Sequence, residues 1–322
     1  MSQPAGFLYL SRSTLDGLAI SAADVVESIE NLIRARAQSR AWSAPKAAFT
    51  PPDGRYMMST LSAADNPPYL AVKAVVLNPR NPERGLDGIN ATVVLLNSDT
   101  GLPVAVMDGN WVTAIRTAGL SAVAAMRMAR ADSTIVAFVG CGVQAHSHLH
   151  TFAELFPLKE IRAFGRGSVN RDKLCASAEK MGMSAVASST ADDAIRDADI
   201  VITSVTFSSE LEPFLDARRL KPGAFVSSTD LAIPWIPEGM PSFDQIVIDD
   251  LEQEAAMSEP MVDPDLVSGD LSGLVTGELA GRGTDAERTA FVFRAVAMGD
   301  LALAALGYEK AREQSQGVSI EA

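Results

Sequence analysis

The chain has 322 residues, with 27 lysines and arginines against 40 aspartates and glutamates, which gives a formal net charge of -13. Hydrophobic residues make up 47% and charged residues 21%, a composition typical of a folded globular protein and not of a disordered one. The acidic balance argues against a nucleic-acid partner, because such binding needs a basic face. Two cysteines are too few for a disulfide scaffold, and no stretch approaches the roughly 18 apolar residues of a membrane span. We therefore expect a cytoplasmic protein without membrane contact.

The first third of the chain predicts a helix followed by an antiparallel sheet. Ala22–Gln38 places its apolar side chains on one helical face, which indicates an amphipathic helix. Tyr69–Leu77, Ile89–Asn97 and Leu102–Met107 are apolar runs that predict strands. The turn-forming segment Ser98–Gly101 separates the last two and predicts a β-hairpin. These elements favour a mainly antiparallel sheet with flanking helices.

Beyond Ile135, short apolar strands alternate with helical segments, a rhythm that predicts a parallel, doubly wound sheet. The predicted elements are strand Ile135–Val139, a helix to Leu155, strand Glu160–Phe164, helix Arg171–Met181, and strands Ala198–Thr203, Gly223–Ser227 and Gln245–Ile248. One long helix, Thr289–Gln314, follows, and Gln316–Ala322 is expected to be a frayed tail. The predicted fold class is α/β, with a Rossmann-type domain over residues 117–289 inserted in an α+β domain of residues 1–116 and 290–322.

A glycine-rich motif lies after the first strand of the predicted Rossmann domain. Val139–Ala145 matches the pattern G-x-G-x-x-A. Gly140 allows the tight turn, Gly142 lets the backbone approach a pyrophosphate, and Ala145 keeps the helix close to the strand. The motif sits between a predicted strand and a predicted helix, and this context favours nucleotide binding over a structural turn.

The end of the second strand of this domain indicates the type of cofactor. An NAD site usually has Asp or Glu there to bind the ribose 2′-hydroxyl. This chain instead has Arg166 and Ser168, with Arg171 just beyond. A guanidinium and a hydroxyl suit a 2′-phosphate, which a carboxylate would repel, so NADPH is the favoured form of the NAD(P)H cofactor. The alternative is a solvated turn in which Arg166 stacks on the adenine.

All three histidines fall within six residues, at His146, His148 and His150. His146 and His150 are four residues apart on one helical face, a spacing that would suit two metal ligands. The sequence offers no third ligand, and the helix must pack on the sheet. We therefore favour structural or solvent-exposed histidines and expect no metal.

Three segments closely resemble the ornithine cyclodeaminase/mu-crystallin family, and within it the mu-crystallin-like ketimine reductases. They are Ala105–Asn110, Thr113–Ala118 and Val139–His148, and the order of elements fits nearly the whole chain. The resemblance implies an NAD(P)-dependent enzyme that acts on a small anionic imino or amino acid. It also implies a homodimer, in which the N-terminal domain and the C-terminal helix form the interface.

The resemblance assigns substrate-site residues by position. Arg116 matches the family arginine that grips the substrate carboxylate, and Lys73 matches the family lysine that holds the carboxylate or transfers a proton. Many family members have a second arginine at the position of Lys46. A lysine there keeps the positive charge but lacks the planar guanidinium that would bind the substrate carboxylate. The structural alternatives are a surface cation for Lys46 and a strand-end lysine for Lys73. The expected cofactor-binding residues are Thr113, Gly140, Gly142, Val143, Gln144, Arg166, Ser168, Arg171, Ser204 and Thr206.

One departure from the family pattern bears on the reaction class. Cyclodeaminases carry an aspartate shortly before a proline; aligned on Pro234, this chain has Ala232, and its nearest carboxylate is Asp230. Either Asp230 reaches the site as a catalytic acid from a shifted loop, or the acid is absent, as in mu-crystallin-like members. We therefore expect a reductase of a small α-imino acid, such as a cyclic ketimine carboxylate. The alternatives are a cyclodeaminase-like lyase with bound NAD and a non-catalytic, crystallin-like binding protein.

Overall fold

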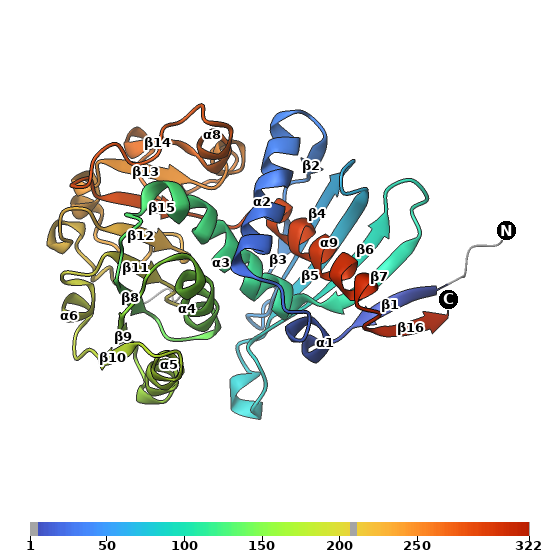
Figure 1. Cartoon of the computed structure of the whole chain (residues 1–322), viewed down its shortest axis with the longest axis horizontal. Helices are drawn as coiled ribbons and strands as arrows, with labels where there is room; N and C mark the ends of the chain where they lie inside the picture. The colour runs from blue at the N-terminus through green and yellow to red at the C-terminus, as the bar shows by residue number, and fades with distance from the viewer. Residues whose placement is uncertain (1–5, 207–210, 322) are drawn as a thin grey trace. The chain divides into compact units, whose positions relative to one another are not determined.

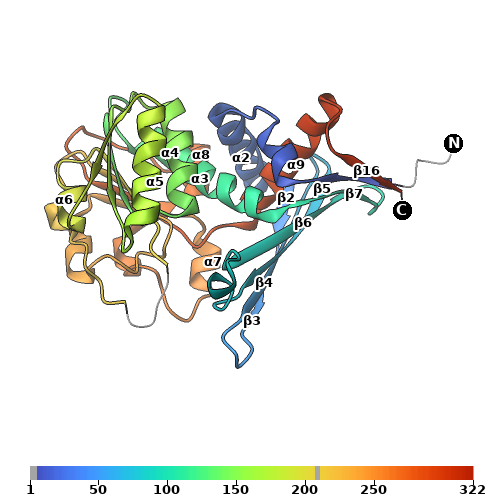
Figure 2. The same ribbon diagram turned by 90° about the horizontal axis from the view of Figure 1, so that it is seen from below.

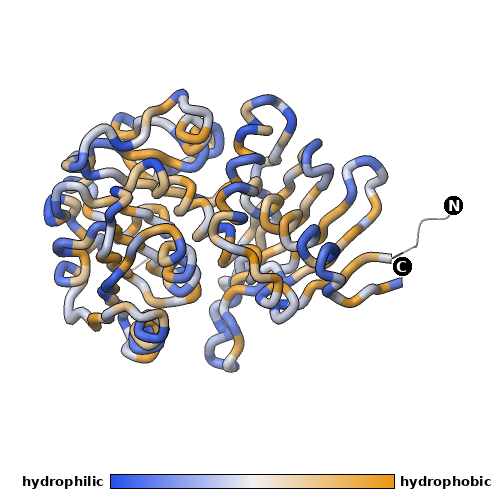
Figure 3. The backbone as a smooth tube through the Cα atoms, in the orientation of Figure 1, coloured by the Kyte–Doolittle hydropathy of each residue, from blue (hydrophilic) through white to orange (hydrophobic). Residues whose placement is uncertain are grey.

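The computed structural model describes residues 6–206 and 211–321 (Figure 1). The chain forms two compact units, one of Met1–Arg116 with Val296–Ala322 and one of Thr117–Ala295. The first boundary falls inside a single helix, α3 (Gly109–Met128). In both units hydrophobic and hydrophilic segments alternate along the chain (Figure 3). The two units are described separately below.

The first unit is built on an eight-stranded sheet with the order β16-β1-β7-β6-β5-β4-β2, and β3 pairs with β4. Strands β1 and β7 run parallel, and the other described pairs are antiparallel. Its elements are β1 (Gly6–Leu10), α1 (Arg12–Asp16), α2 (Ala22–Ala37), β2 (Ala41–Ser43), β3 (Ala47–Phe49), β4 (Tyr56–Ala64), β5 (Tyr69–Leu77), a 3₁₀ turn (Pro82–Arg84), β6 (Ile89–Asn97), β7 (Pro103–Asp108), the start of α3, α9 (Ala297–Glu313) and β16 (Val318–Glu321).

Helices α2 and α9 pack together on one face of this sheet (Figure 2). Helix α2 begins at a capping box, in which Ser21 and Asp24 each bond the backbone N–H of the other. Its apolar stripe, which includes Val25, Ile29 and Leu32, is buried. Helix α9 is buried on nearly every side along most of its length, so it forms the centre of the unit.

The second unit is a parallel sheet with the order β10-β9-β8-β11-β12-β15-β13-β14. This is a Rossmann-type doubly wound sheet, as the sequence predicts. Its elements are the remainder of α3, β8 (Ile135–Val139), α4 (Val143–Leu155), β9 (Glu160–Phe164), α5 (Ser168–Lys180), β10 (Ser184–Ala187), α6 (Ala191–Ile195), β11 (Ile200–Thr203), a 3₁₀ turn (Ala217–Arg219), β12 (Phe225–Ser228), a 3₁₀ turn (Pro237–Ser242), β13 (Gln245–Ile248), α7 (Leu251–Ala255), a 3₁₀ turn (Pro264–Leu266), β14 (Val267–Asp270), α8 (Leu271–Thr276) and β15 (Thr289–Val292).

The C-terminal region differs from the prediction in two places. Thr289–Gln314 is not one helix, because Thr289–Val292 is strand β15, which pairs with β12 and β13, and the helix begins at Ala297. The predicted frayed tail contains strand β16, which pairs with β1; Ala322 lies outside the described residues. Both strands pair with segments that are distant in sequence. Among the described residues, no helix has both the length and the apolar character that a membrane span requires.

Candidate functional site

The predicted substrate residues Lys73 and Arg116 come together in the first unit, and an aspartate lies between them. Lys73 is on β5, where the alternation of side chains turns it toward the face that α9 covers. Arg116 lies on α3, one turn after Thr113. Asp300 projects from α9, and both cations lie within ion-pair distance of it. A buried, charged cluster therefore forms at the centre of the unit.

Both cations approach the same oxygen of Asp300. Lys73 Nζ lies 2.5 Å from Asp300 Oδ1, and Arg116 Nε lies 3.1 Å from that atom. The hydroxyl of Thr60, on β4, donates to the other oxygen, Oδ2, at 3.0 Å. Lys73 Nζ also lies 3.4 Å from the hydroxyl of Thr113. Lys73 and Asp300 are each 2% exposed, so the cluster is almost completely desolvated.

The cluster carries more positive than negative charge. Burial lowers the pKa of Lys73 to about 8, although the neighbouring Asp300 carboxylate opposes this effect, and Arg116 and Lys46 lower it further. Burial alone would raise the pKa of Asp300, but the charges of Lys73 and Arg116 outweigh it and hold that pKa below its ordinary value. One carboxylate thus balances two cations, and a further anion is needed to neutralise the site.

The guanidinium of Arg116 has unused hydrogen-bonding capacity. Its Nε and Nη1 atoms are buried and have no hydrogen-bond acceptor among the described residues, so the Nε contact with Asp300 is an ion pair of poor hydrogen-bond geometry. Buried guanidinium donors without acceptors destabilise the fold, and a carboxylate or similar anion would accept their hydrogen bonds. Lys46, which precedes β3, is half-buried and close enough for its charge to act on Lys73. The three predicted substrate-site cations therefore share one region.

The glycine-rich loop of the second unit has the backbone that dinucleotide binding requires. Gly140 has a φ of +96°, and a Cβ atom there would lie 2.4 Å from the carbonyl oxygen of Ser204. At Gly142 a Cβ would meet no heavy atom within 4 Å, so the backbone is open to a ligand. Helix α4 starts directly afterwards at Val143, and within the described part of the chain no side chain caps it. The buried Oε1 of Gln144 also lacks a donor there. Open backbone N–H groups at a helix start suit a pyrophosphate.

Five further predicted cofactor residues follow strands of the same sheet, whereas Thr113 lies on α3 in the first unit, beside Lys73. Arg166 follows β9 and is exposed, and Ser168 is the first residue of α5, whose start also has no side-chain cap within the described chain. Arg171, further along α5, forms an ion pair with Asp172 at 3.0 Å. The other two predicted residues, Ser204 and Thr206, follow β11, and the Ser204 hydroxyl donates to the carbonyl oxygen of Gly140 at 3.3 Å.

Asp230 is held at the end of β12 by hydrogen bonds within the second unit. Its Oδ1 accepts from the hydroxyls of Ser228 at 2.6 Å and Thr203 at 2.8 Å, and its Oδ2 accepts from the backbone N–H of Val205 at 2.8 Å. Burial raises its pKa, and these hydrogen bonds act in the opposite direction. The next two residues, Leu231 and Ala232, have φ values of 60° and 59°, a left-handed conformation that is costly for residues other than glycine. Asp230 thus anchors a strained turn.

The histidine segment lies on α4, and one of its members is structural. His148 is fully buried, and burial lowers its pKa to about 4, whereas His150 is exposed. Across residues 6–206 and 211–321, no group of three His, Cys, Asp or Glu side chains is arranged to hold a metal ion.

Sequence reasoning missed Asp300 and Thr60. Asp300 is the lone charged residue in the apolar stretch Ala297–Tyr308, and this isolation was the available signal. A charge on a buried helix normally needs a partner, so the stretch could have been matched to Lys73 or Arg116. Thr60 gives no such signal, because a threonine in a strand is ordinary.

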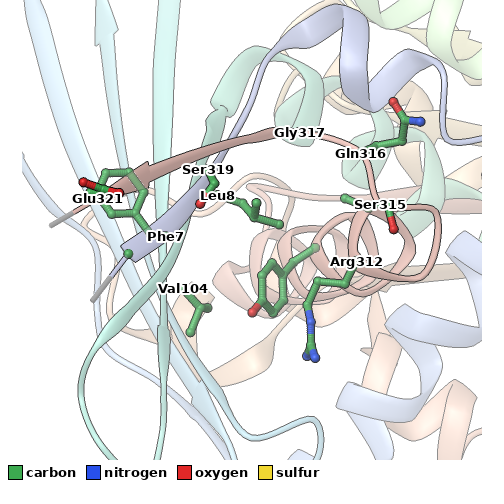
Figure 4. A pocket seen from close by; sticks show the side chains of 12 residues that line it. Phe7, Leu8, Val104, Arg312, Ser315, Gln316, Gly317, Ser319 and Glu321 are labelled. Carbon is green, nitrogen blue, oxygen red and sulfur yellow. The ribbon is translucent and has the colours of Figure 1, made fainter. Parts of the chain in front are cut away.

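A surface pocket of about 820 Å³ lies elsewhere in the first unit, where α9 ends beside β1 and β16 (Figure 4). Phe7, Leu8 and Val104 form its apolar side. Arg312, on the opposite side, lies over the ring of Tyr308, 5.6 Å from the ring centroid. The pocket contains none of the predicted site residues, so we place a candidate substrate site at the Lys73 cluster of the first unit and a candidate cofactor site at the glycine-rich loop of the second.

The chain is similar in sequence and in structure to known proteins. Residues 10–315 match the ornithine cyclodeaminase/mu-crystallin family. The structure is similar to that of Thermococcus litoralis Delta(1)-pyrroline-2-carboxylate reductase in complex with NADH and L-proline, with a TM-score of 0.89, 27% identity and coverage of 98% of this chain and 100% of that chain. It is also similar to an archaeal alanine dehydrogenase dimer with bound NAD, with a TM-score of 0.87, 26% identity and coverage of 98% and 99%. The ketimine reductase mu-crystallin of Rattus norvegicus is 34% identical over 204 residues, 63% of each chain.

Proposed function

The chain belongs to the ornithine cyclodeaminase/mu-crystallin family, and from this premise we propose that it is an NAD(P)H-dependent reductase of a small α-imino acid. The observation that carries the proposal is the unbalanced charge of the buried cluster. Two cations, Lys73 and Arg116, share one carboxylate oxygen, and buried donors of Arg116 remain without an acceptor. A substrate carboxylate would supply the missing negative charge and accept those donors.

Arg116, Lys46 and Lys73 have different roles in the proposed reaction. Arg116 binds the substrate carboxylate and orients the imine carbon, and Lys46 adds positive charge at the edge of the site. Lys73, with its pKa near 8, is protonated around neutral pH and lies in position to hold the carboxylate or donate a proton. The bound nicotinamide supplies the hydride that reduces the C=N bond. Fixed placement of the reacting groups supplies much of the acceleration.

The turn after β12 favours a reductase over a cyclodeaminase. Residue 232 is an alanine and has no group that takes a proton from a substrate amine. Asp230 is the nearest carboxylate in the sequence, but it is buried and already accepts three hydrogen bonds from its own sheet. We therefore assign Asp230 to the support of the turn and not to catalysis. A substrate that already contains the C=N bond needs no such base.

We propose NADPH as the preferred cofactor. Arg166 is exposed next to the uncapped start of α5, where Ser168 also lies, and these groups suit a 2′-phosphate. The alternative role for Arg166 is stacking on the adenine, which would serve NADH equally well.

The test is a substrate panel followed through NAD(P)H absorbance. We expect oxidation of NADPH with Δ1-pyrroline-2-carboxylate or with linear 2-imino acids formed from 2-keto acids and ammonia. L-Ornithine with a catalytic amount of NAD is the contrasting arm, and we expect no proline from it. Proline and ammonia from that arm would establish the lyase alternative. Tight binding of imino acids without turnover in any arm would establish the non-catalytic alternative.

A further inference from the structure

We propose that Asp300 is a positioning residue, which holds Lys73 and Arg116 on one carboxylate oxygen and so assembles the substrate-binding cations against their mutual repulsion. The kinetic consequences of this inference rest on the proposed function. The contacts of Asp300 with Lys73 and Arg116, and their effect on the pKa of Lys73, are properties of the free protein. It assigns a role to a residue of α9 that contacts the substrate-binding cations and is not itself one of the groups proposed to bind substrate.

Asp300 contacts both cations through one oxygen atom. Lys73 Nζ and Arg116 Nε lie 2.5 Å and 3.1 Å from the same atom, Asp300 Oδ1. The hydroxyl of Thr60 fixes the second oxygen at 3.0 Å, so the carboxylate cannot turn freely. These three partners come from β5, α3 and β4, which are separate elements. Asp300 therefore sets where both cations stand relative to each other.

The charge of Asp300 also affects the pKa of Lys73. Three charged groups act on Lys73 from the elements around it: Asp300 on α9, Arg116 on α3, and Lys46 before β3. Burial and the two cations all favour the neutral amine, and among these groups Asp300 alone favours the ammonium form. Without the carboxylate, Lys73 would be desolvated beside two like charges, and its pKa would fall well below about 8.

Burying the Asp300 carboxylate carries a free-energy penalty. Asp300 is 2% exposed and is surrounded in sequence by Met298, Leu301 and Leu303, all of them buried. An ionised carboxylate at such a place destabilises the fold unless it is paired, and apolar residues of similar size are often at least as stabilising as a buried ion pair. The presence of an aspartate on this face of α9 is therefore better explained by its pairing with the two cations than by a contribution to packing.

The decisive experiment measures the titration of Lys73 in the cofactor-free full chain, by NMR of protein labelled with ¹³C at lysine Cε. The Lys73 signal is identified by its loss in Lys73→Arg. We expect the titration midpoint of Lys73 to fall by about one pH unit or more in Asp300→Asn, as for a buried lysine that loses its counter-charge. Thr60→Val, which keeps the carboxylate, is the matched control and should move the midpoint much less. An unchanged midpoint in Asp300→Asn overturns the proposal, whatever the enzyme's substrate.

A kinetic measurement then links the titration to the site. In Asp300→Asn the KM for Δ1-pyrroline-2-carboxylate should rise at least about tenfold, while the NADPH Kd stays within about twofold. The loss should be smaller when the substitution is made in Lys73→Met, because the two residues act through each other. Equal losses in both backgrounds contradict the proposal.

A second variant covers the case in which Asp300→Asn does not fold. Arg116→Leu removes the cation that shares Oδ1, so the midpoint of Lys73 should rise above its value in the unmodified protein. A fall or no change in that variant would mean that the shared carboxylate does not couple the two cations.

Discussion

His148 Nε2 lies 2.8 Å from the hydroxyl oxygen of Ser121, and this contact completes a buried hydrogen-bond chain in the second unit. The other ring nitrogen, Nδ1, lies 2.7 Å from the carbonyl oxygen of Gln144. A carbonyl only accepts, so Nδ1 carries a proton. Burial lowers the pKa of His148 to about 4, so the ring is neutral near pH 7 and Nε2 accepts from Ser121. The hydroxyl of Ser227 donates in turn to Ser121 at 2.8 Å. The chain joins α4, α3 and β12 around an imidazole that burial keeps neutral.

The lowered pKa of His148 predicts an acid-sensitive fold. Burial lowers the pKa of His148 from 6.5 to about 4. Between these two pH values the imidazole is protonated in the unfolded chain but stays neutral in the folded chain. The contribution to stability is complete above pH 6.5 and is lost as the pH falls toward 4, amounting to roughly 3 kcal/mol at ~1.4 kcal/mol per pH unit. Urea unfolding at a series of pH values measures it. His148→Gln should flatten this slope, and His150→Gln, an exposed control, should not; equal slopes for all three proteins contradict the assignment.

Arg116→Leu tests the assignment of the carboxylate site. The substitution removes the donors that we expect the substrate to use, and we expect kcat/KM for Δ1-pyrroline-2-carboxylate to fall by about 10²- to 10³-fold. The NADPH Kd should be nearly unchanged, because the glycine-rich loop belongs to the second unit. Arg34→Leu, which breaks a surface ion pair with Glu30 on α2, is the control. Unchanged turnover in Arg116→Leu would remove this residue from the site.

Arg166→Ala tests the cofactor preference. A charge-assisted bond to a 2′-phosphate predicts a rise of roughly tenfold in the NADPH Kd, with the NADH Kd within about twofold of its original value. Fluorescence titration with each nucleotide measures both constants. Lys173→Ala, at an exposed position on the neighbouring helix α5, is the control for the loss of a surface cation. A parallel loss for NADPH and NADH would favour the alternative in which Arg166 stacks on the adenine.

The outer face of the first unit's sheet predicts a homodimer. Leu61, Val72, Val94, Val106 and Tyr9 are successive cross-strand neighbours over five strands. They lie on the face opposite Lys73 and α9, and Leu61 and Tyr9 are nearly half exposed. An apolar row of this length on an uncovered face is typical of an interface between subunits.

We expect light scattering at micromolar concentration to give twice the mass of one chain. Leu61→Glu should shift the protein toward the monomer, because it places a charge in this apolar row. Val169→Glu, at an exposed position on α5, should leave the dimer intact. A monomeric unmodified protein, or a Leu61→Glu variant that remains fully dimeric, would contradict this interface.

Much of the fold was predictable because its signals are local. The strands Tyr69–Leu77 and Ile89–Asn97 were predicted with the observed bounds, since their apolar runs end at turn-forming residues. The strand, glycine-rich loop and helix around Gly140 were also predicted, because a tight turn that approaches phosphate restricts both residue type and spacing.

The features that were missed depend on partners distant in sequence. Strand β15 merges with the apolar residues before α9, and only its pairing with β12 and β13 separates it from a helix. Strand β16 exists because β1 lies beside it. Asp300 acquires its role from Lys73 and Arg116, which lie far earlier in the chain. A periodicity describes one segment at a time and cannot identify such partners.

The discontinuous first unit also determines an order of assembly during translation. The ribosome synthesises Lys73 on β5 and Arg116 on α3 before it begins the second unit, whose segment Thr117–Ala295 is uninterrupted. At about 5–20 residues per second, α9 and Asp300 follow roughly 10–40 s later. Until then the nascent first sheet lacks its covering helix, and its two cations have no counter-charge. The middle of the chain can therefore fold first, and the unit that holds Lys73 and Arg116 is completed after it.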